Sequence, residues 1–195
     1  MISRRHFTAA GLAAMAMGAM PAQAARKKKA QVMTAEQLEP KIVRFDGDVG
    51  PGEIHVLPDH FVLLWTLTRG QAVRYYVGIG RPGLYEPGTF FVGAKKEWPS
   101  WVPTEAMIER DPEKYAKYAD GMPGGEDNPL GARALYLFTK EKGDTFLRIH
   151  GTNQPETIGT AVSNGCARLV NEQIIELYDQ VPLDTKVVLY PKSTS

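Results

Sequence analysis

The sequence has a single cysteine, almost no net charge and no long, strongly apolar segment. One cysteine cannot form a disulfide within the chain, nor a multi-cysteine zinc site. A net charge of +1 argues against a dedicated nucleic-acid-binding protein, which carries a basic excess. The apolar stretches are too short or too weakly hydrophobic for stable insertion into a membrane. These absences exclude several classes of protein and leave the lone Cys166 to be explained.

The length and composition suit one globular domain. The chain has 195 residues, of which 43% are hydrophobic, and its 19 glycines and 14 prolines favour strands and structured loops over long helices. We therefore expect a mainly β fold, with α-helix only at its margins.

Residues 1–24 are interpreted as a cleaved export signal. The pair Arg4-Arg5 precedes an apolar stretch over 7–20, and the small residues of Ala22-Gln23-Ala24 suit a signal peptidase. The paired arginines resemble a twin-arginine (Tat) signal, and the alternative is an ordinary Sec signal. Either signal predicts a periplasmic or cell-envelope protein. Cleavage removes two basic residues and no acidic ones, so the remaining 21 basic and 22 acidic residues give a net charge of −1.

Residues 25–49 are expected to form a linker, and residues 50–191 the folded domain. The linker opens with a basic run over 26–29 and has no sustained apolar period. This run is either a solvated tether or a point of attraction to anionic polymers of the envelope.

Short runs of β-branched and aromatic residues, separated by Gly/Pro turns, predict strands. They are Ile54–Leu57, Phe61–Leu67, Ala72–Val77, Thr89–Val92, Ala134–Phe138, Thr145–Ile149 and Thr185–Tyr190. The first four suggest a meandering antiparallel sheet. A helix is predicted over Asn171–Gln180, with Asn171 as its N-cap.

Between Gly93 and Gly131 the pattern changes. One short helix is predicted from Pro103 to Arg110, and a second begins at Asp111-Pro112. An insertion of this length within a compact domain is usually functional, and the alternative is a surface excursion that covers a sheet edge.

Two motifs match known signatures without the context that those signatures need. Residues 78–83 fit GxGxxG, but Pro82 lies inside the motif and no helical period follows, so we do not expect nucleotide binding. The string Ala161–Gly165 approaches the GxSxG nucleophile elbow, with Ala161 in place of the first glycine and no strand-to-helix elbow. Ser163 as a nucleophile is therefore the weaker alternative.

The segment from 149 to 169 contains both His150 and Cys166. We expect His150 to close a strand and the Ser163-Asn164-Gly165 turn to present Cys166. A thiol is intrinsically very nucleophilic, and a neighbouring imidazole can take its proton and later protonate a leaving amine. The pair therefore indicates nucleophilic acyl chemistry.

Neighbouring groups can complete such a site. A backbone carbonyl beside His150 can fix the imidazole tautomer. The N–H groups of the turn can face a developing oxyanion, and Arg168 can bind a substrate carboxylate in bidentate fashion.

The plain alternative is that Cys166 is a small buried hydrophobe, as lone cysteines most often are. The polar turn before it favours the functional interpretation. The distant His55 and His60 are interpreted as surface or sheet residues. Their sparseness predicts no metal site.

The segment resembles the signature of the L,D-transpeptidase family, with its YkuD-type catalytic domain. The family pattern is a histidine, an interval of about 16 residues, and Ser-His-Gly-Cys followed by a small residue and Arg or Asn. Here the interval from His150 to Cys166 is 16. Four upstream strings add to the resemblance, which covers roughly residues 50–191: Tyr76–Gly80, Gly88–Phe90, Trp98–Trp101 and Asn128–Gly131.

The resemblance implies a β-sandwich-like catalytic domain over 50–191, in which the 93–131 insertion walls the cleft. It implies Cys166 as nucleophile, His150 as base, the carbonyl of Gly151 as the group that orients the histidine, and Arg168 as a contact for substrate carboxylate. No cofactor or metal is implied. The implied partners are peptidoglycan stem peptides, an envelope protein as a second acyl acceptor, and a carbapenem as covalent inhibitor.

One position departs from the family pattern, since Asn164 stands where the family has its second histidine. Asparagine donates and accepts hydrogen bonds but carries no charge. The departure puts the acceptor and the pH profile in question rather than the His150/Cys166 pair. The alternatives are a carboxypeptidase or hydrolase of the same linkage, and a non-catalytic wall-binding module.

Overall fold

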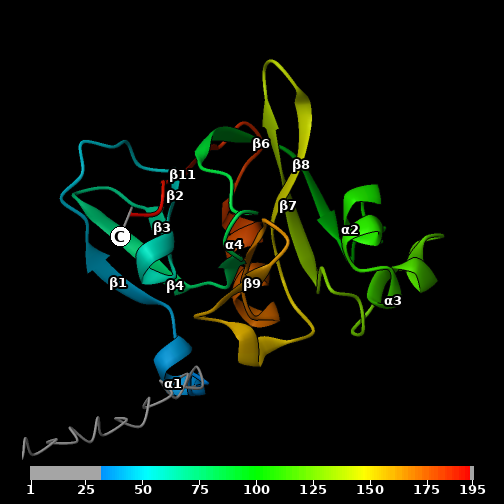
Figure 1. The fold of residues 1–195 in the computed structure, drawn as a ribbon. Coiled ribbons are helices and arrows are strands. Elements are labelled where there is room, and N and C mark those ends of the chain that lie inside the picture. The colour runs from blue at the N-terminus through cyan, green and yellow to red at the C-terminus, as the bar shows by residue number, and fades with distance from the viewer. Residues whose placement is uncertain (1–31, 194–195) are drawn as a thin grey trace, which may run out of the picture.

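A computed structural model describes residues 32–193, so the predicted export signal lies outside the described part of the chain. A nine-stranded mixed sheet forms the body of the protein, in the order β1-β4-β3-β2-β11-β6-β7-β8-β10 (Figure 1). A two-stranded ladder pairs β5 with β9. The strands are β1 (Lys41–Arg44), β2 (Ile54–Leu57), β3 (Val62–Thr66), β4 (Gln71–Tyr76), β5 (Ile79–Gly80), β6 (Gly88–Glu97), β7 (Arg133–Thr139), β8 (Gly143–His150), β9 (Ala161–Ser163), β10 (Ala167–Arg168) and β11 (Lys186–Leu189).

The helices of the described residues are short. They are α1 (Ala35–Leu38), α2 (Glu105–Arg110), α3 (Pro112–Tyr115) and α4 (Asn171–Gln180), with 3-10 turns η1 (Pro58–His60), η2 (Ala116–Tyr118) and η3 (Pro155–Thr157). Within residues 32–193, no helix has the length and apolarity needed to span a membrane.

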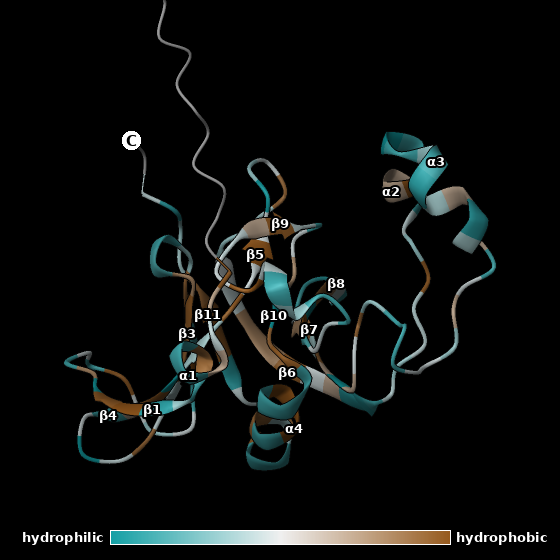
Figure 2. Ribbon diagram, turned by 90° about the horizontal axis from the view of Figure 1, so that it is seen from below, coloured by the Kyte–Doolittle hydropathy of each residue, from teal (hydrophilic) through white to brown (hydrophobic). Residues whose placement is uncertain are grey.

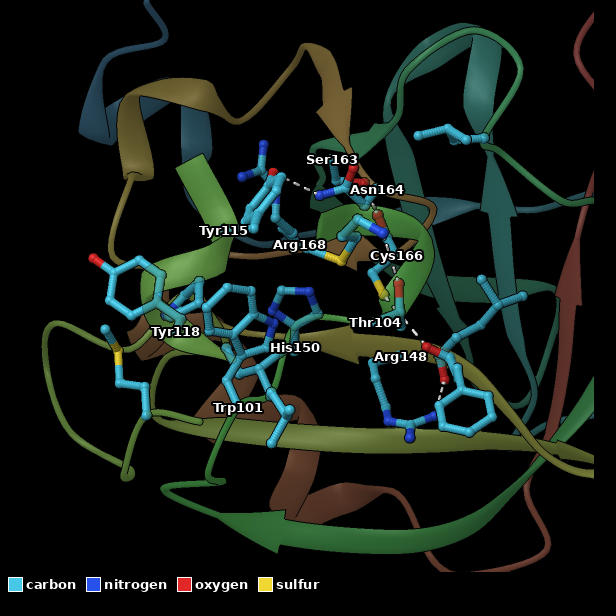
Figure 3. Close-up of a pocket in the computed structure, with 18 of the residues that line it drawn as sticks. Trp101, Thr104, Tyr115, Tyr118, Arg148, His150, Ser163, Asn164, Cys166 and Arg168 are labelled. Carbon is cyan, nitrogen blue, oxygen red and sulfur yellow. Dashed lines mark hydrogen bonds between the residues drawn. The ribbon is translucent and has the colours of Figure 1, made fainter. Parts of the chain in front are cut away.

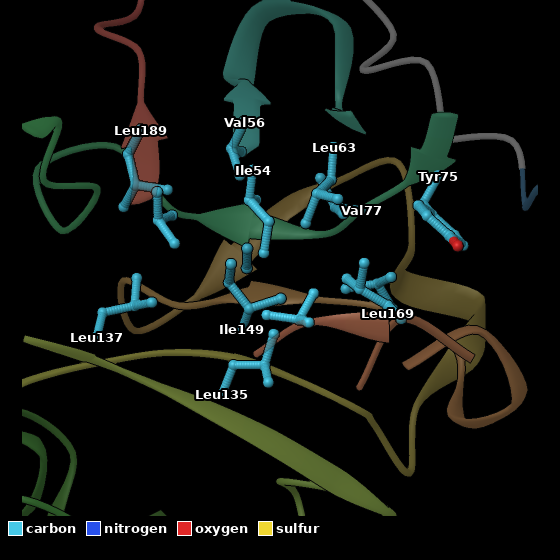
Figure 4. Packing of buried hydrophobic residues seen from close by; sticks show 14 of the residues in the cluster. Ile54, Val56, Leu63, Tyr75, Val77, Leu135, Leu137, Ile149, Leu169 and Leu189 are labelled. Atoms are coloured by element: carbon cyan, nitrogen blue, oxygen red, sulfur yellow. The ribbon is translucent and has the colours of Figure 1, made fainter. Parts of the chain in front are cut away.

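One hydrophobic core lies between two halves of the long sheet. Ile54 and Leu63 project from β2 and β3, and Leu135 and Ile149 face them from β7 and β8 (Figure 4). Alternate side chains of a strand point to one face, which lets each of these strands contribute a row of buried residues. Helix α4 packs its apolar side against β7 and leaves hydrophilic turns outward (Figure 2). The predicted mainly β, sandwich-like fold is confirmed.

The sheet is mixed, and the predicted antiparallel meander describes only its β2–β3–β4 part. Strand β11 pairs parallel with β2 and antiparallel with β6. Strand β10 pairs parallel with β8. Pairings between strands so far apart in sequence leave no local pattern, so the alternation within each strand could not predict them.

The predicted linker over 25–49 is wrong for the part that the structure describes. Residues 41–44 form β1, which pairs with β4 at the sheet edge. Helix α1 has a capping box in which Thr34 and Gln37 bond reciprocally, at 3.3 and 2.9 Å. Each element has only four residues, too few for a periodic pattern to reveal.

The insertion starts later than predicted, because β6 continues to Glu97. Helices α2 and α3 follow and stand away from the β1–β4 end of the sheet (Figures 1 and 2). Trp101 pairs with Met122 through two backbone hydrogen bonds of 2.9 and 2.7 Å. The indole also contacts the rings of Tyr115 and Tyr118 edge-on. These contacts give the insertion a small aromatic core of its own.

A matched pair of isoleucines tests where the stability lies. Ile54→Ala, at 0% exposure in the core, should lower the free energy of unfolding by about 2–5 kcal/mol. Ile42→Ala, at 65% exposure on the edge strand β1, should change it by no more than about 0.5 kcal/mol. Urea titration followed by fluorescence measures both. Equal losses in the two variants would contradict this description of the core.

Candidate active site

A cavity of about 960 Å³ lies between the insertion and the sheet. The insertion supplies one wall through residues such as Thr104, Tyr115 and Tyr118, as the resemblance implied (Figure 3). Strand β8 and the turn before β10 supply the facing wall. His150, Cys166 and Arg168 all line this space.

The parallel pairing of β8 with β10 brings the predicted residues together. In this register Arg168 lies beside His150, and Ala167 lies beside Ile149. Residues two apart in a strand share a face, so Arg168 and Cys166 extend along one row and His150 and Arg148 along the next. The ladder thus brings Cys166, which follows His150 by 16 residues in the chain, to the same cavity as His150 (Figure 3).

His150 is buried, with 5% of its surface exposed. Its Nδ1 lies 2.6 Å from the carbonyl oxygen of Gly151, and since a carbonyl only accepts, Nδ1 carries the proton. Nε2 therefore keeps the free lone pair that a base needs. Burial and the positive charge of Arg168 lower the pKa of His150 to about 3, so the imidazole is neutral at pH 7.

Cys166 is half-buried, and its Sγ lies 4.0 Å from the carbonyl oxygen of Phe146. Burial raises the pKa of the Cys166 thiol, and the charges of Arg148 and Arg168 act in the opposite direction. Because His150, which lines the same cavity, is neutral, the resting groups are a thiol and an imidazole rather than a thiolate and an imidazolium. Such a pair suits proton transfer at the moment of attack.

The turn before Cys166 is held by Ser163. Its hydroxyl donates to the carbonyl of Cys166 at 2.6 Å and accepts from the N–H of Gly165 at 3.3 Å. Gly165 has φ +129°, and a side chain there would approach the carbonyl of Leu84. The Ser163 hydroxyl is engaged inside the turn and no helix follows it directly, so the nucleophile elbow is absent here.

Arg168 is 8% exposed, and its Nε and Nη2 have no hydrogen-bond partner within the described residues. Its backbone exchanges two hydrogen bonds with Gly78, of 2.9 and 2.8 Å. A Cβ on Gly78 would lie 3.3 Å from Nη2, so the glycine makes room for the guanidinium. A buried, unpartnered guanidinium lining a cavity is suited to a carboxylate.

The sequence analysis did not identify Arg148 as a site residue. Its guanidinium forms two bonds of 2.7 and 2.8 Å with Asp144 and lies 4.0 Å from the ring centre of Tyr136. Arg148 precedes His150 by two residues, and the period of a strand could have placed both on one face.

Asn171 has a different role from the one predicted. Helix α4 has Val170 as its N-cap, without a side-chain bond. The Asn171 Oδ1 instead accepts from the N–H groups of Ala132 and Thr152, at 3.0 and 3.2 Å. Asn171 thus links Ala132, just before β7, to Thr152, in the segment that follows Gly151. No pattern in the sequence signals that long-range role.

The other histidines of the described residues, His55 and His60, do not line the cavity. His55 lies in β2 and is 1% exposed, beside Glu53, as the sheet interpretation predicted. Among residues 32–193 no three His, Cys, Asp or Glu side chains gather in a way that could hold a metal ion.

Residues 51–189 match the family model for the L,D-transpeptidase catalytic domain, YkuD. The chain belongs to this family. A probable L,D-transpeptidase ErfK/SrfK of Salmonella typhimurium is 40% identical over 157 residues, which cover 70% of this chain and 48% of that protein. A putative L,D-transpeptidase of Fuscovulum blasticum is 33% identical over 194 residues, covering 90% of this chain and 94% of the relative. The chain thus spans about half of the first relative and nearly all of the second.

Solved structures share the fold. One from Brucella melitensis, described as a probable carnitine operon oxidoreductase, is 48% identical, covers 78% of this chain and 93% of that chain, and has a TM-score of 0.54. In the present chain, no helix begins within residues 78–83. Its GxGxxG string therefore does not form a dinucleotide site. The avibactam carbamoyl enzyme of Ldtfm is 18% identical, covers 74% and 51% of the two chains, and has a TM-score of 0.55.

The buried neutral histidine predicts a pH dependence of stability in this L,D-transpeptidase family member. The unfolded chain protonates His150 near pH 6.5, whereas the folded protein does so only near pH 3. Stability from this residue is therefore full above pH 6.5 and is lost as the pH falls toward 3, by up to about 1.4 kcal/mol per unit. Urea titrations between pH 7 and 4 should show a shallower slope for His150→Gln than for the wild type.

The exposed His60 provides the matched control, since His60→Gln should keep the wild-type slope. Parallel pH curves for His150→Gln and the wild type would mean that the folded protein does not suppress protonation of this imidazole.

Proposed function

We propose that the protein is a cysteine-dependent L,D-transpeptidase that transfers acyl groups of peptidoglycan stem peptides. The observation that supports it most is geometric: His150, whose Nδ1 is held by the carbonyl of Gly151, lines one cavity with Cys166 and with the unpartnered guanidinium of Arg168. Family membership supports the proposal. The two relatives described above are also named as L,D-transpeptidases.

The first half-reaction forms a thioester. Nε2 of His150 takes the proton of the Cys166 thiol while the sulfur attacks the carbonyl of the third, L-centred residue of a stem tetrapeptide. The bond from that carbonyl to the D-alanine nitrogen then breaks, and the imidazolium returns the proton to the leaving amine. The donor remains as an acyl group on the sulfur.

The second half-reaction releases the enzyme. An amine attacks the thioester, and His150 takes the proton of that amine. The bond between the carbonyl carbon and sulfur then breaks, and the imidazolium returns the proton to the sulfur of Cys166. The acceptor is either a diamino-acid side chain of another stem, which gives a 3-3 cross-link, or the terminus of an envelope protein. No cofactor or metal enters either step.

The cationic side chains stabilise charge that appears during these steps. Arg148 and Arg168 both lower the thiol pKa of Cys166, which favours negative charge on sulfur. Arg168 is also placed to hold a substrate carboxylate near the reacting atoms. The N–H of Gly165 is engaged with Ser163 in this structure, so an oxyanion role for this N–H requires that bond to open.

Two other functions remain as alternatives. Water as acceptor would make the protein an L,D-carboxypeptidase or hydrolase of the same linkage. A wall-binding module without catalysis would follow if Asn164 had inactivated the site. We also propose export to the envelope through residues 1–24, by the Tat or the Sec route.

Intact-mass analysis with a carbapenem tests the nucleophile. The wild type should gain the mass of one carbapenem, because the thiol opens the β-lactam ring without a leaving group, and Cys166→Ala should gain none. His150→Gln should react at least about 100-fold more slowly, since it lacks the base. Solved structures of the same fold carry an avibactam-derived carbamoyl group and a faropenem-derived adduct. An adduct that persists in Cys166→Ala would refute the assignment.

Product analysis separates the transferase from the hydrolase. With purified tetrapeptide donor and an excess of an amine acceptor, the amide product should exceed the free acid at least about tenfold. Omitting the acceptor should slow release of D-alanine, because the thioester then waits for water. Equal yields of free acid with and without the amine would favour the hydrolase, and unaltered muropeptides with retained binding to sacculi would favour the binding module.

A further inference from the structure

Two arginines converge on one uncharged oxygen at the rim of the cavity. The Oδ1 of Asn164 accepts from Nη2 of Arg110 at 2.8 Å and from Nη2 of Arg81 at 3.4 Å. Arg110 ends α2 in the insertion, and Arg81 follows β5. Two positive charges are thus brought together by segments that are distant in the sequence.

Neither guanidinium has an acidic partner within 4.0 Å among residues 32–193. The two guanidinium groups bind the same oxygen atom, so their positive charges repel each other, and this neutral amide oxygen offsets only part of the repulsion. The lining of the cavity adds Lys114 and Lys117, against the acidic Glu86 and Asp127. An anion bound between the two arginines would neutralise the positive charge that the described residues leave unpaired there.

The backbone of Arg81 is bonded to the turn that presents Cys166. The N–H of Arg81 donates to the carbonyl of Ser163 at 3.0 Å. A Cβ on Gly80 would lie 3.0 Å from the Cα of Gly165, so only glycine lets the two segments approach this closely. The GxGxxG string therefore builds the wall of the site instead of a nucleotide loop.

Asparagine suits the centre of this cluster better than histidine does. Its oxygen accepts from both arginines while its Nδ2 donates to the hydroxyl of Tyr115 at 3.0 Å (Figure 3). A protonated imidazole accepts no hydrogen bond and adds a third positive charge. The departure of Asn164 from the family pattern thus coincides with the point where Arg81 and Arg110 meet.

We propose that Arg81 and Arg110, held together by Asn164, form a second carboxylate-binding subsite, separate from Arg168. It takes a carboxylate of the donor peptide outside the leaving residue, and so selects donors that carry a free acid at that point. The inference rests on the proposed function for the identity of the donor. Planar carboxylates match paired guanidinium donors in geometry and charge.

Donor binding to the full chain carrying Cys166→Ala tests the subsite without turnover. The donors are a synthetic stem tetrapeptide and versions in which each carboxylate outside the leaving residue is changed, one at a time, to a carboxamide. One amidation should raise the Kd, measured by calorimetry, about tenfold. Adding Arg110→Ala or Arg81→Ala should raise the Kd of the free acid similarly and abolish the effect of that amidation.

Two variants sharpen the result. Asn164→Asp is nearly isosteric and places a carboxylate between the arginines, so it should remove the discrimination while both guanidinium groups remain. Arg44→Ala, on the exposed edge strand β1, is the matched control and should leave all Kd values unchanged. If no amidation affects binding, or if Arg110→Ala weakens the acid and the amide equally, the subsite is refuted.

Transfer assays on the wild type keep this result apart from the proposed function. Discrimination between acid and amide in binding, with no acyl transfer from any donor, would refute the transferase and leave the subsite standing. Transfer from all donors with equal KM would support the transferase and refute the subsite.

Discussion

The site depends on one short pairing, in which two residues of β10 run parallel to the end of β8. This ladder sets Arg168 beside His150 and carries Cys166 to the neighbouring turn. It is a parallel contact at the edge of the sheet, so it needs support from elsewhere. The support comes from the two backbone bonds of Gly78 to Arg168 and from the bond of the Leu169 N–H to the His150 carbonyl, at 2.9 Å. Displacing β10 would move Cys166, the proposed nucleophile, away from His150, the proposed base.

The electrostatics of the site follow from the same pairing. It places two arginines around the histidine and the thiol, and their positive charges act to lower the pKa of both groups. They help to lower the pKa of His150, which keeps a base available, and they oppose the effect of burial on the pKa of Cys166, which eases thiolate formation. Asp144 pairs with Arg148, so of these two arginines it is Arg168 that retains an uncompensated charge toward the cavity. One buried cation can therefore act on the nucleophile, the base and the substrate.

The sequence predicted what is local and missed what is distant. Strands such as Ile54–Leu57 were predictable from their β-branched residues between turn signals, and the helix over Asn171–Gln180 from its amphipathic period, because both signals lie within the segment itself. Thiol chemistry and the family resemblance agree in predicting the His150/Cys166 pair, and the structure brings both residues to one cavity. The parallel pairings, the edge strand over 41–44 and the hydrogen bonds of Asn171 depend on contacts across the fold. They have no counterpart in local composition.

The polar turn and the glycine-rich string show why a motif needs its structural context. Both matched signatures of other chemistries, and both proved to be parts of one wall. Gly78 leaves space for the Arg168 guanidinium, and Gly80 lets the chain lie against Gly165. Arg81 then reaches the side chain of Asn164. Since Asn164 also contacts Arg110 and Tyr115, the insertion and the catalytic turn are linked through a single amide. A charged residue in place of Asn164 would therefore change the charge at the rim of the cavity and also disrupt the contacts that link the insertion to this turn.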